Sequence, residues 1–260
     1  MIRLREVITA LEAWAPPQWA DSYDNVGLLW GDPDMPLSGV LTTLDITSAV
    51  LEEARSLHAN LIVSHHPLWF GEKNRLHWGL PADRLTYLLI QAGISVYAIH
   101  TNIDQAPDGV SYVLCKVLDL RPVGFLRTNG GTHGAGYIGE YPQPLEAEAF
   151  LRHLQKKLEL PAIRYTAGSQ PTIRRVGVCG GAGSFLLPEA LHAGVDAFLT
   201  ADIPYHRFFE AEGRIWLADI GHYESERWIA QIFADFLHQK FPFLPVFTTR
   251  IRTSPIQHWI

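Results

Sequence analysis

The sequence predicts an α/β protein whose mainly parallel or mixed sheets are covered by helices. Short apolar, β-branched runs alternate with segments of helical spacing along much of the chain, which is the pattern of a largely parallel sheet. Polar clusters follow several of the predicted strands, and open α/β sheets carry their ligand sites at those ends. The 260 residues, 47% of them hydrophobic, suffice to bury a full core.

The first 120 residues show this alternation most clearly. From Leu4 to Trp14 the apolar groups lie three and four residues apart, as on one face of a helix. Thr47 or Ser48 can cap the helix that follows the first strand. In order, we expect a helix over 4–14, a strand over 39–45, a helix over 47–57, a strand over 61–63, a helix over 83–92, a strand over 94–99 and a helix over 109–118.

Residues 120–135 differ in composition from the chain before them. Arg121-Pro122 and the stretch Thr128-Asn-Gly-Gly-Thr132 are rich in turn formers, which predicts a domain junction. Beyond it, Ser184 is expected to cap a helix. We expect strands over 135–141, 162–166, 174–179, 197–200, 215–218 and 245–249, and helices over 145–158, 184–192, 204–212 and 223–239.

Charge and composition exclude several classes of protein. A net charge of −6 argues against a nonspecific nucleic-acid or anionic-membrane surface, because both need concentrated Lys and Arg. The two cysteines, Cys115 and Cys179, form no C-x-x-C pattern, which favours a reducing compartment over a disulfide framework. The first residues lack the apolar core of a signal peptide, and no run approaches the roughly 20 apolar residues of a membrane span. We therefore expect a cytoplasmic protein without a membrane contact.

The motif Ser64-His65-His66-Pro67 directly follows the predicted strand 61–63. Successive side chains of an extended chain point to opposite sides. We therefore expect His65 and His66 to serve two metal ions, or one ion and one further hydrogen bond, rather than to chelate one ion together.

Two further histidine-carboxylate clusters follow strands, at 100–104 and 219–226. His222 and Glu226 are four residues apart at the start of a predicted helix, so both should lie on one face and share one metal or bridge two. Imidazole and carboxylate suit Zn, Fe, Mn, Co or Ni. No cysteine belongs to a cluster, which argues against a closed structural zinc site.

Each cluster also has a structural interpretation. His100 could be a core histidine that bonds a carbonyl or orients a ligand, and Asp104 could cap the helix near residue 109. Glu226 could act only through the helix dipole, and Glu224 is expected to face solvent. Because such clusters recur at three strand ends, the pattern as a whole favours metal.

Several other residues are candidates for the same site. Gly180-Gly-Ala-Gly183 before a helix fits a phosphate cradle or a tight turn, and the missing P-loop Lys and dinucleotide spacing favour the turn. Asp202 and His206 follow the predicted strand 197–200, and with His100 they are candidates for proton transfer. Asp24-Asn-Val-Gly27 predicts a turn that could pack against the site.

In this order the motifs resemble the Nif-three-like family, whose members are often called GTP cyclohydrolase 1 type 2 homologues. The resemblance covers essentially the whole chain and implies two similar α/β domains with two divalent metal ions in the cleft between them. We place the first domain at 1–125 with 222–260 and the second at 126–221. The family also implies a ring-shaped homohexamer. The matching motifs are Asp24-Asn-Val-Gly27, Ser-His65-His66-Pro, His100-Thr-Asn-x-Asp104, Cys179-Gly-Gly-x-Gly-Ser184-Phe and Gly221-His222-x-x-Ser225-Glu226.

The resemblance also assigns metal ligands by position. It implies that His66 and Asp104 hold one ion, that His65 and His222 hold the other, and that Glu226 bridges them. His100 matches a position close to the metals.

Two classes of function are compatible with such a site. A metal-dependent hydrolase would use the ions to activate water against a nucleotide or phosphoester. The family label suggests opening of the GTP purine ring, but the H-x-E…P-C-x-x-C signature of zinc deaminases is absent. The alternatives are a protein that stores, delivers or inserts metal ions without a substrate, and a regulatory protein that binds a partner.

Overall fold

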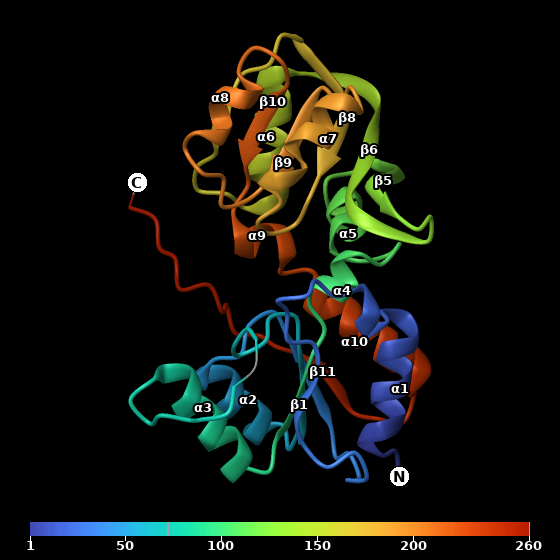
Figure 1. Cartoon of the computed structure of the whole chain (residues 1–260), viewed down its shortest axis with the longest axis vertical. Helices are drawn as coiled ribbons and strands as arrows, with labels where there is room; N and C mark the ends of the chain where they lie inside the picture. Colours follow the sequence, from blue (N-terminus) through green and yellow to red (C-terminus); the bar gives the residue numbers. More distant parts are fainter. Residues whose placement is uncertain (72, 260) are drawn as a thin grey trace. The chain divides into compact units, whose positions relative to one another are not determined.

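The computed structural model describes residues 1–71 and 73–259 (Figure 1). The chain forms two compact units, the first made of Met1–Ile103 and Ile229–Pro255, the second of Asp104–Trp228 and Ile256–Ile260. Each unit has its own sheet with helices against it, which confirms the predicted α/β class. The domain division given above, 1–125 with 222–260 and 126–221, has different limits from these compact units and stays a prediction.

The first unit contains a five-stranded sheet in the order β1-β4-β3-β2-β11. β2, β3, β4 and β11 are parallel, and β1 pairs antiparallel with β4 at the edge. All residues of β2, β3 and β4 are buried, as expected for a parallel sheet covered on both faces. The strands are β1 Gly27–Trp30, β2 Val40–Thr43, β3 Leu61–Ser64, β4 Ser95–Ala98 and β11 Val246–Thr248; the helices are α1 Leu4–Trp14, α2 Ser48–Ser56, α3 Pro81–Gln91 and α10 Ile229–Lys240.

The second unit contains a six-stranded mixed sheet in the order β5-β6-β8-β9-β10-β7. β8, β9 and β10 are parallel, and the other pairings are antiparallel. The strands are β5 Arg121–Asn129, β6 His133–Glu146, β7 Arg164–Thr166, β8 Thr172–Val178, β9 Ala197–Thr200 and β10 Trp216–Asp219; the helices are α5 Val110–Val117, α6 Ala147–Leu158, α7 Leu187–His192, α8 Arg207–Ala211 and α9 His222–Glu226. The short helix α4 Thr101–Asp104 contains the point where the chain passes from the first unit to the second.

The turn-rich residues 120–135, where a domain junction is predicted, lie within one pair of strands. These residues form the hairpin of β5 and β6, whose pairing runs from Arg121 opposite Glu140 to Asn129 opposite His133. Gly130 and Gly131 have φ of +65° and +85° and form its turn. Turn-forming residues mark a tight hairpin as readily as a linker, and only the long-range strand pairing distinguishes the two.

Two helix predictions also need correction. Ser184 begins a short 3-10 helix rather than capping α7, which starts at Leu187. Pro188 has no N–H to donate and therefore fits the first turn of α7. The helix expected over 223–239 is two helices, α9 ending at Glu226 and α10 beginning at Ile229, and the chain passes from the second unit back to the first between them.

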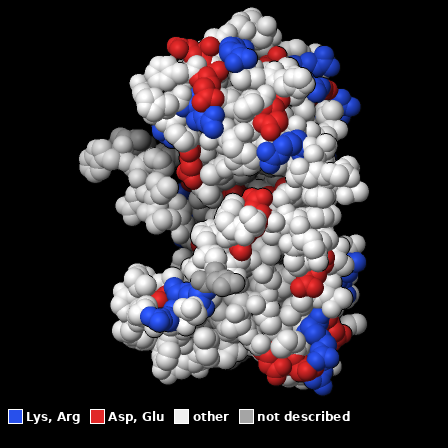
Figure 2. All heavy atoms as spheres, in the orientation of Figure 1, with Lys and Arg blue, Asp and Glu red and all other residues white. Residues whose placement is uncertain are grey.

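β1 is an element that the sequence analysis did not predict. Residues 24–27 were interpreted only as a turn, and β1 begins at Gly27, the last of them. None of the described helices is both long and apolar enough to cross a bilayer. On the face shown in Figure 2, acidic and basic side chains are interspersed, without one large patch of either sign.

Candidate metal centre

Three neighbouring parallel strands of the first unit end in residues that can bind metal or orient a metal ligand. Thr43 of β2 lies opposite Ser64 of β3, which in turn lies opposite Ala98 of β4, so the strands end level with one another. The residues that follow them are Asp45, the pair His65 and His66, and His100. Because parallel strands end at the same edge of a sheet, these side chains gather there.

His65, His66 and His100 form one cluster. One ring nitrogen of each lies within 4.8 Å of those of the other two, so the group could hold a metal ion. The ring centroids are 4.9 Å apart for His65 and His66, and 5.0 and 5.3 Å from these two to His100. His65 is fully buried, whereas His66 and His100 are partly exposed.

The expectation that His65 and His66 point to opposite sides is wrong. β3 ends at Ser64, and both histidines lie in the bend that follows it. Their backbone N–H groups donate to the carbonyls of Thr43 and Leu44, at 3.1 and 2.9 Å. The alternation of side chains holds only for an extended strand, so the bend allows both rings to enter the same cluster.

The Nδ1 atom of each clustered histidine has a hydrogen-bond acceptor. His65 Nδ1 donates to the Ile99 carbonyl at 3.0 Å, and His66 Nδ1 donates to Asp45 Oδ1 at 2.7 Å. His100 Nδ1 donates to Asp24 at 2.9 Å. A proton on Nδ1 leaves the lone pair on Nε2, the nitrogen that a metal would take. Metal-binding histidines usually have such a partner, so these residues fit a metal ion.

Asp24 is a residue of the site that sequence reasoning missed. Its carboxylate is fully buried and also accepts hydrogen bonds from the backbone N–H and the hydroxyl of Thr101, at 3.0 and 2.5 Å. Burial by itself would raise the pKa of Asp24. The hydrogen bonds and charge of His100, together with the bonds from Thr101, outweigh it and lower the pKa to about 2.

Asp45 was missed for the same reason as Asp24. It bonds His66, and its other oxygen accepts from the Thr253 hydroxyl at 2.5 Å. The partner of Asp24 lies 76 residues away and that of Asp45 lies 21 residues away. The motif Asp24-Asn-Val-Gly27 was visible in the sequence, but nothing local indicated that its carboxylate would meet a histidine.

The second unit carries a histidine-carboxylate pair on α9. His222 Nε2 lies 3.1 Å from Glu226 Oε2, which confirms that residues four apart share one face of the helix. Glu226 is buried. His222 Nδ1 donates to Asp202 Oδ2 at 2.7 Å. Asp202 has a left-handed φ of +52°, an unusual conformation for a residue other than glycine that places its carboxylate beside His222.

The glycine loop 180–183 packs beside this pair. A Cβ atom on Gly181, whose φ is +60°, would lie 2.2 Å from Glu226 Oε1, so no side chain fits there. The loop donates three backbone N–H groups to hydroxyl oxygens: Gly180 to Ser111 at 3.4 Å, Gly181 to Ser225 at 3.0 Å and Gly183 to Thr200 at 2.8 Å. Because these N–H groups have partners within the protein, the loop is better explained as a tight turn than as a phosphate cradle.

Asp104 and Glu226 both act on the buried thiol of Cys179. Burial, followed by the negative charges of these two carboxylates, raises the pKa of Cys179 to about 12. In the protein without metal, the thiol is therefore neutral at physiological pH. Asp104 itself is half-buried at the end of α4.

The two remaining predicted site residues, Asp202 and His206, have different surroundings. Asp202 bonds His222, as described above. His206 is exposed and packs its ring against Tyr205 and Phe209. Within the described residues it belongs to no group of potential metal ligands. Its role in proton transfer, like those of His100 and Asp202, stays a prediction.

The expectation that Glu224 faces solvent is wrong, because its side chain is buried. Gly221, with φ of +76°, turns the chain into α9, and a Cβ atom at that position would lie 2.3 Å from Glu224 Oε2. The carboxylate of Glu224 therefore folds back onto the start of the helix, where the positive end of the helix dipole favours a negative charge.

Comparisons with known proteins agree on one family. A family model described as Duf34/NIF3 (NGG1p interacting factor 3) matches residues 2–255. A "GTP cyclohydrolase 1 type 2 homolog" of Streptomyces coelicolor is 37% identical over 234 residues, which cover 87% of this chain and 82% of the relative. A protein of Nostoc sp. with the same name is 36% identical over 232 residues, covering 87% and 88%.

Solved structures share the fold. A hypothetical protein of Staphylococcus aureus has a TM-score of 0.91 at 28% identity, covering 99% of each chain. A Bacillus cereus protein related to NIF3 has a TM-score of 0.91 at 21% identity, covering 100% of this chain and 99% of its own. At that lower identity the second comparison supports the fold alone.

Proposed function

This chain belongs to the Duf34/NIF3 family, and we propose that it is a metal-dependent hydrolase that acts on a nucleotide or phosphoester through two divalent ions. One observation carries the proposal: His65, His66, His100 and His222 each bind a carbonyl or carboxylate through Nδ1. This is the orientation in which Nε2 can bind metal. Histidines with only a packing role have no common reason to be held in this way.

We propose five residues as the ligands of the two ions. His66 and Asp104 would hold one ion, His65 and His222 the other, and Glu226 would bridge the two, as the family resemblance implies. A set of imidazoles and carboxylates suits Zn, Fe, Mn, Co or Ni. The 3.1 Å approach of His222 to Glu226 supports their role as neighbouring ligands.

The chain's own residues would orient the ligands and move protons. Two divalent ions supply a water nucleophile near neutral pH and polarise a phosphoryl oxygen. Asp45 and Asp202 would fix the rings of His66 and His222. His100 would accept a proton at Nε2, because the carboxylate of Asp24 at its Nδ1 stabilises the imidazolium.

The name that the relatives carry supports a nucleotide as the substrate class. For these relatives the words "GTP cyclohydrolase 1 type 2 homolog" state only homology. Two-metal sites commonly cleave phosphoesters by in-line displacement, and we therefore propose phosphoester or nucleotide hydrolysis ahead of purine ring opening.

Elemental analysis of the full chain, purified without added metal, tests the metal centre. We expect roughly two transition-metal ions per chain, and reduced occupancy in His65→Ala and His66→Ala. His238→Ala, an exposed histidine at the end of α10, is the matched control and should bind as wild type does. Wild-type occupancy below about half an ion per chain, not restored by added Mn, Zn, Fe, Co or Ni, would refute the proposal.

Glu226→Gln tests the bridge between the two ions. A bridging carboxylate contributes to both sites, so its loss should lower the occupancy of both ions. Glu224→Gln, two residues away on the same helix, should lower neither. Two ions retained by Glu226→Gln would show that Glu226 does not bridge.

A screen of nucleotides and phosphoesters, run with the metal found by elemental analysis, separates the classes of function. Turnover that is lost in the His65 and His66 variants supports a hydrolase. Full metal occupancy without turnover of any of these compounds would favour metal storage or delivery over hydrolysis.

We also propose that the chain forms a homohexamer, as the family resemblance implies. We propose a cytoplasmic location because the cysteine usage favours a reducing compartment. Light scattering coupled to size exclusion measures the assembly mass directly. The chain mass is 29.2 kDa, and a particle of that mass alone would contradict the proposed assembly.

A further inference from the structure

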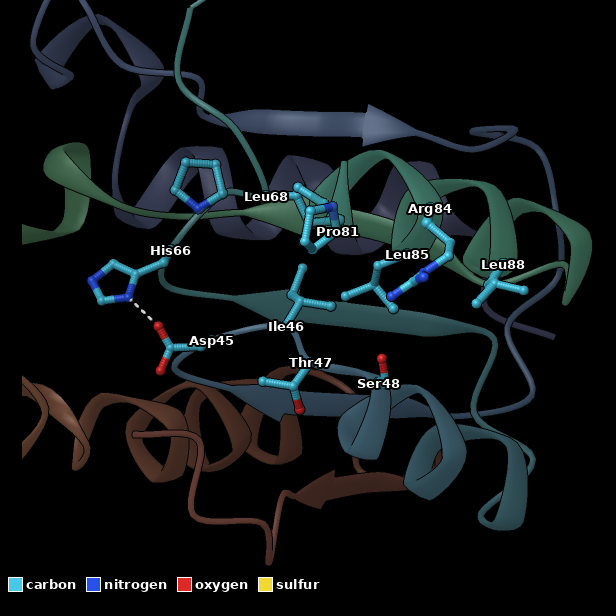
Figure 3. Close-up of a pocket in the computed structure, with 12 residues that line it drawn as sticks. Asp45, Ile46, Thr47, Ser48, His66, Leu68, Pro81, Arg84, Leu85 and Leu88 are labelled. Carbon is cyan, nitrogen blue, oxygen red and sulfur yellow. Dashed lines mark hydrogen bonds and ion pairs between the residues drawn. The ribbon is translucent and has the colours of Figure 1, made fainter. Parts of the chain in front are cut away.

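A pocket of about 400 Å³ lies beside His66 in the first unit (Figure 3). Its walls come from the loop after β2, the start of α2, the segment after β3 and one side of α3. The volume is within the range of small-molecule sites. Figure 3 shows His66 and Asp45 at one end, Arg84 toward the other, and the apolar side chain of Ile46 between them.

Arg84 brings an uncompensated positive charge to this pocket. Within the described residues, its side chain has no hydrogen bond or ion pair. The neighbouring acid on the helix, Asp83, is buried and bonds Lys73 and the backbone N–H of His77. A guanidinium offers a fork of N–H donors that matches the oxygens of a phosphate.

The polar groups of the two ends favour opposite charges. At the far end, the exposed hydroxyl of Ser48 and the first turn of α2 accompany Arg84, and a helix start favours an anion. At the near end, the carboxylate of Asp45 beside His66 would repel an anion. The pocket therefore orients an asymmetric ligand, with its anionic group at Arg84.

The middle of the pocket is apolar. Ile46 and Leu85 are buried, and with Leu68 they form the wall between the two polar ends. Such a surface suits a carbon framework or a ring rather than a second charge.

We propose that this pocket binds the phosphate group of a phosphomonoester at Arg84 and Ser48, with the organic part of the molecule lying on the apolar wall and directed toward His66. The inference rests on the proposed function, since it names the part of the hydrolase substrate that is held away from the histidine cluster. Binding energy from such a remote group positions the reacting bond. The phosphate contact itself requires no metal.

Isothermal titration calorimetry with phenyl phosphate tests the pocket. The probe combines a phosphomonoester with a ring for the apolar wall, and the full chain is titrated after removal of metal by a chelator. Arg84→Gln should weaken binding about tenfold or more, because a charge-assisted bidentate contact is lost. Ser48→Ala should weaken it by a smaller factor. Since Arg84 is exposed, we expect the variant to melt at the wild-type temperature.

Arg55→Gln is the matched control. Arg55 is an exposed arginine on α2 that pairs with Glu52 at 3.2 Å and does not line the pocket. It should leave the affinity for phenyl phosphate unchanged. Equal affinity in wild type and Arg84→Gln, or an equal loss in Arg55→Gln, would overturn the inference. Benzoate bound as tightly as phenyl phosphate would overturn the assignment to phosphate.

The test also separates this inference from the proposed function. If elemental analysis finds no metal but phenyl phosphate still binds through Arg84, the phosphate-binding pocket is supported and the proposed metal-dependent hydrolase is refuted. If two ions bind but Arg84→Gln leaves the affinity for phenyl phosphate unchanged, the phosphate-binding pocket is refuted and the metal centre is supported.

Discussion

The two units orient their histidines with the same bond but in different surroundings. In the first unit, the carboxylate that holds His100 belongs to Asp24, whose side chain is 0% exposed. In the second unit, the carboxylate that holds His222 belongs to Asp202, whose side chain is 57% exposed. A buried charge pair is strongly coupled to folding, whereas an exposed pair is screened by water. The Asp24–His100 pair is therefore part of the folded core, whereas the Asp202–His222 pair can be altered at little cost to stability.

Asp24→Asn should lower the stability of the protein more than any change at the second unit's His222 pair. The change removes a buried negative charge that accepts hydrogen bonds from the His100 ring and from the backbone N–H and hydroxyl of Thr101. We expect a loss of about 3 kcal/mol in the free energy of unfolding. Urea unfolding measures it. Asp21→Asn, an exposed carboxylate in the same loop, is the control and should cost under about 0.5 kcal/mol. Equal stability of the two variants would show that Asp24 is not coupled to folding.

The same carboxylate should make stability depend on acid. The folded-state pKa of Asp24, about 2, lies below its ordinary value of 3.8. The unfolded chain therefore binds the proton first, so the contribution of Asp24 is complete above about pH 4 and is lost as the pH falls toward 2. Urea midpoints across this window should fall less steeply in Asp24→Asn than in wild type. Parallel curves would mean that other carboxylates account for the acid sensitivity.

Gly181→Ala should disturb the second unit through geometry rather than charge. The left-handed φ costs a residue with a Cβ atom about 1–2 kcal/mol, and the new atom would also displace the Glu226 carboxylate. Gly194→Ala has nearly the same φ, +62° against +60°, but its Cβ atom would meet nothing within 4 Å. Thermal melting should show both losses, and only Gly181→Ala should also lose metal. Equal metal content in the two variants would mean that Glu226 is not a ligand.

Asp202→Asn should have the smallest effect on stability and so sharpen the comparison with Asp24. An exposed pair contributes under about 1 kcal/mol to folding, but a partner that orients a metal ligand typically contributes tenfold or more to metal affinity. We therefore expect an unchanged melting temperature and metal affinity about tenfold weaker, measured by competition with a chelator. A stability loss as large as that of Asp24→Asn would remove the distinction between the two units.

Much of the site was predictable because its signals are local. His222 and Glu226 reveal their shared face by spacing alone, since four residues make about one helical turn. His65, His66 and His100 follow apolar strands that are short and β-branched, which places them at the ligand-binding edge of a sheet. The structure confirms the two placements: His222 and Glu226 share one face of α9, and the three histidines gather after the ends of their strands.

The errors came from features with no local signal. The glycine-rich stretch near 130 is a hairpin turn rather than a linker, and the difference lies in the pairing of β5 with β6. Glu224 was placed in solvent because its spacing from His222 differs from that of Glu226, but the left-handed turn at Gly221 buries it. Such outcomes depend on the path of the chain outside the helix or strand concerned.

The sequence by itself determined the α/β class, the family and the histidines and carboxylates that could bind a metal ion, because residue type and short-range periodicity specify these. The tertiary structure alone decided how those histidines are held. Asp45 meets His66, 21 residues away, because the parallel strands β2 and β3, joined by a crossover, end at one edge of the sheet. Asp24 meets His100, 76 residues away, because β1 runs antiparallel to β4 and begins beside the end of β4. The proton position on each ring follows from those contacts, so it is a property of the folded chain rather than of any motif.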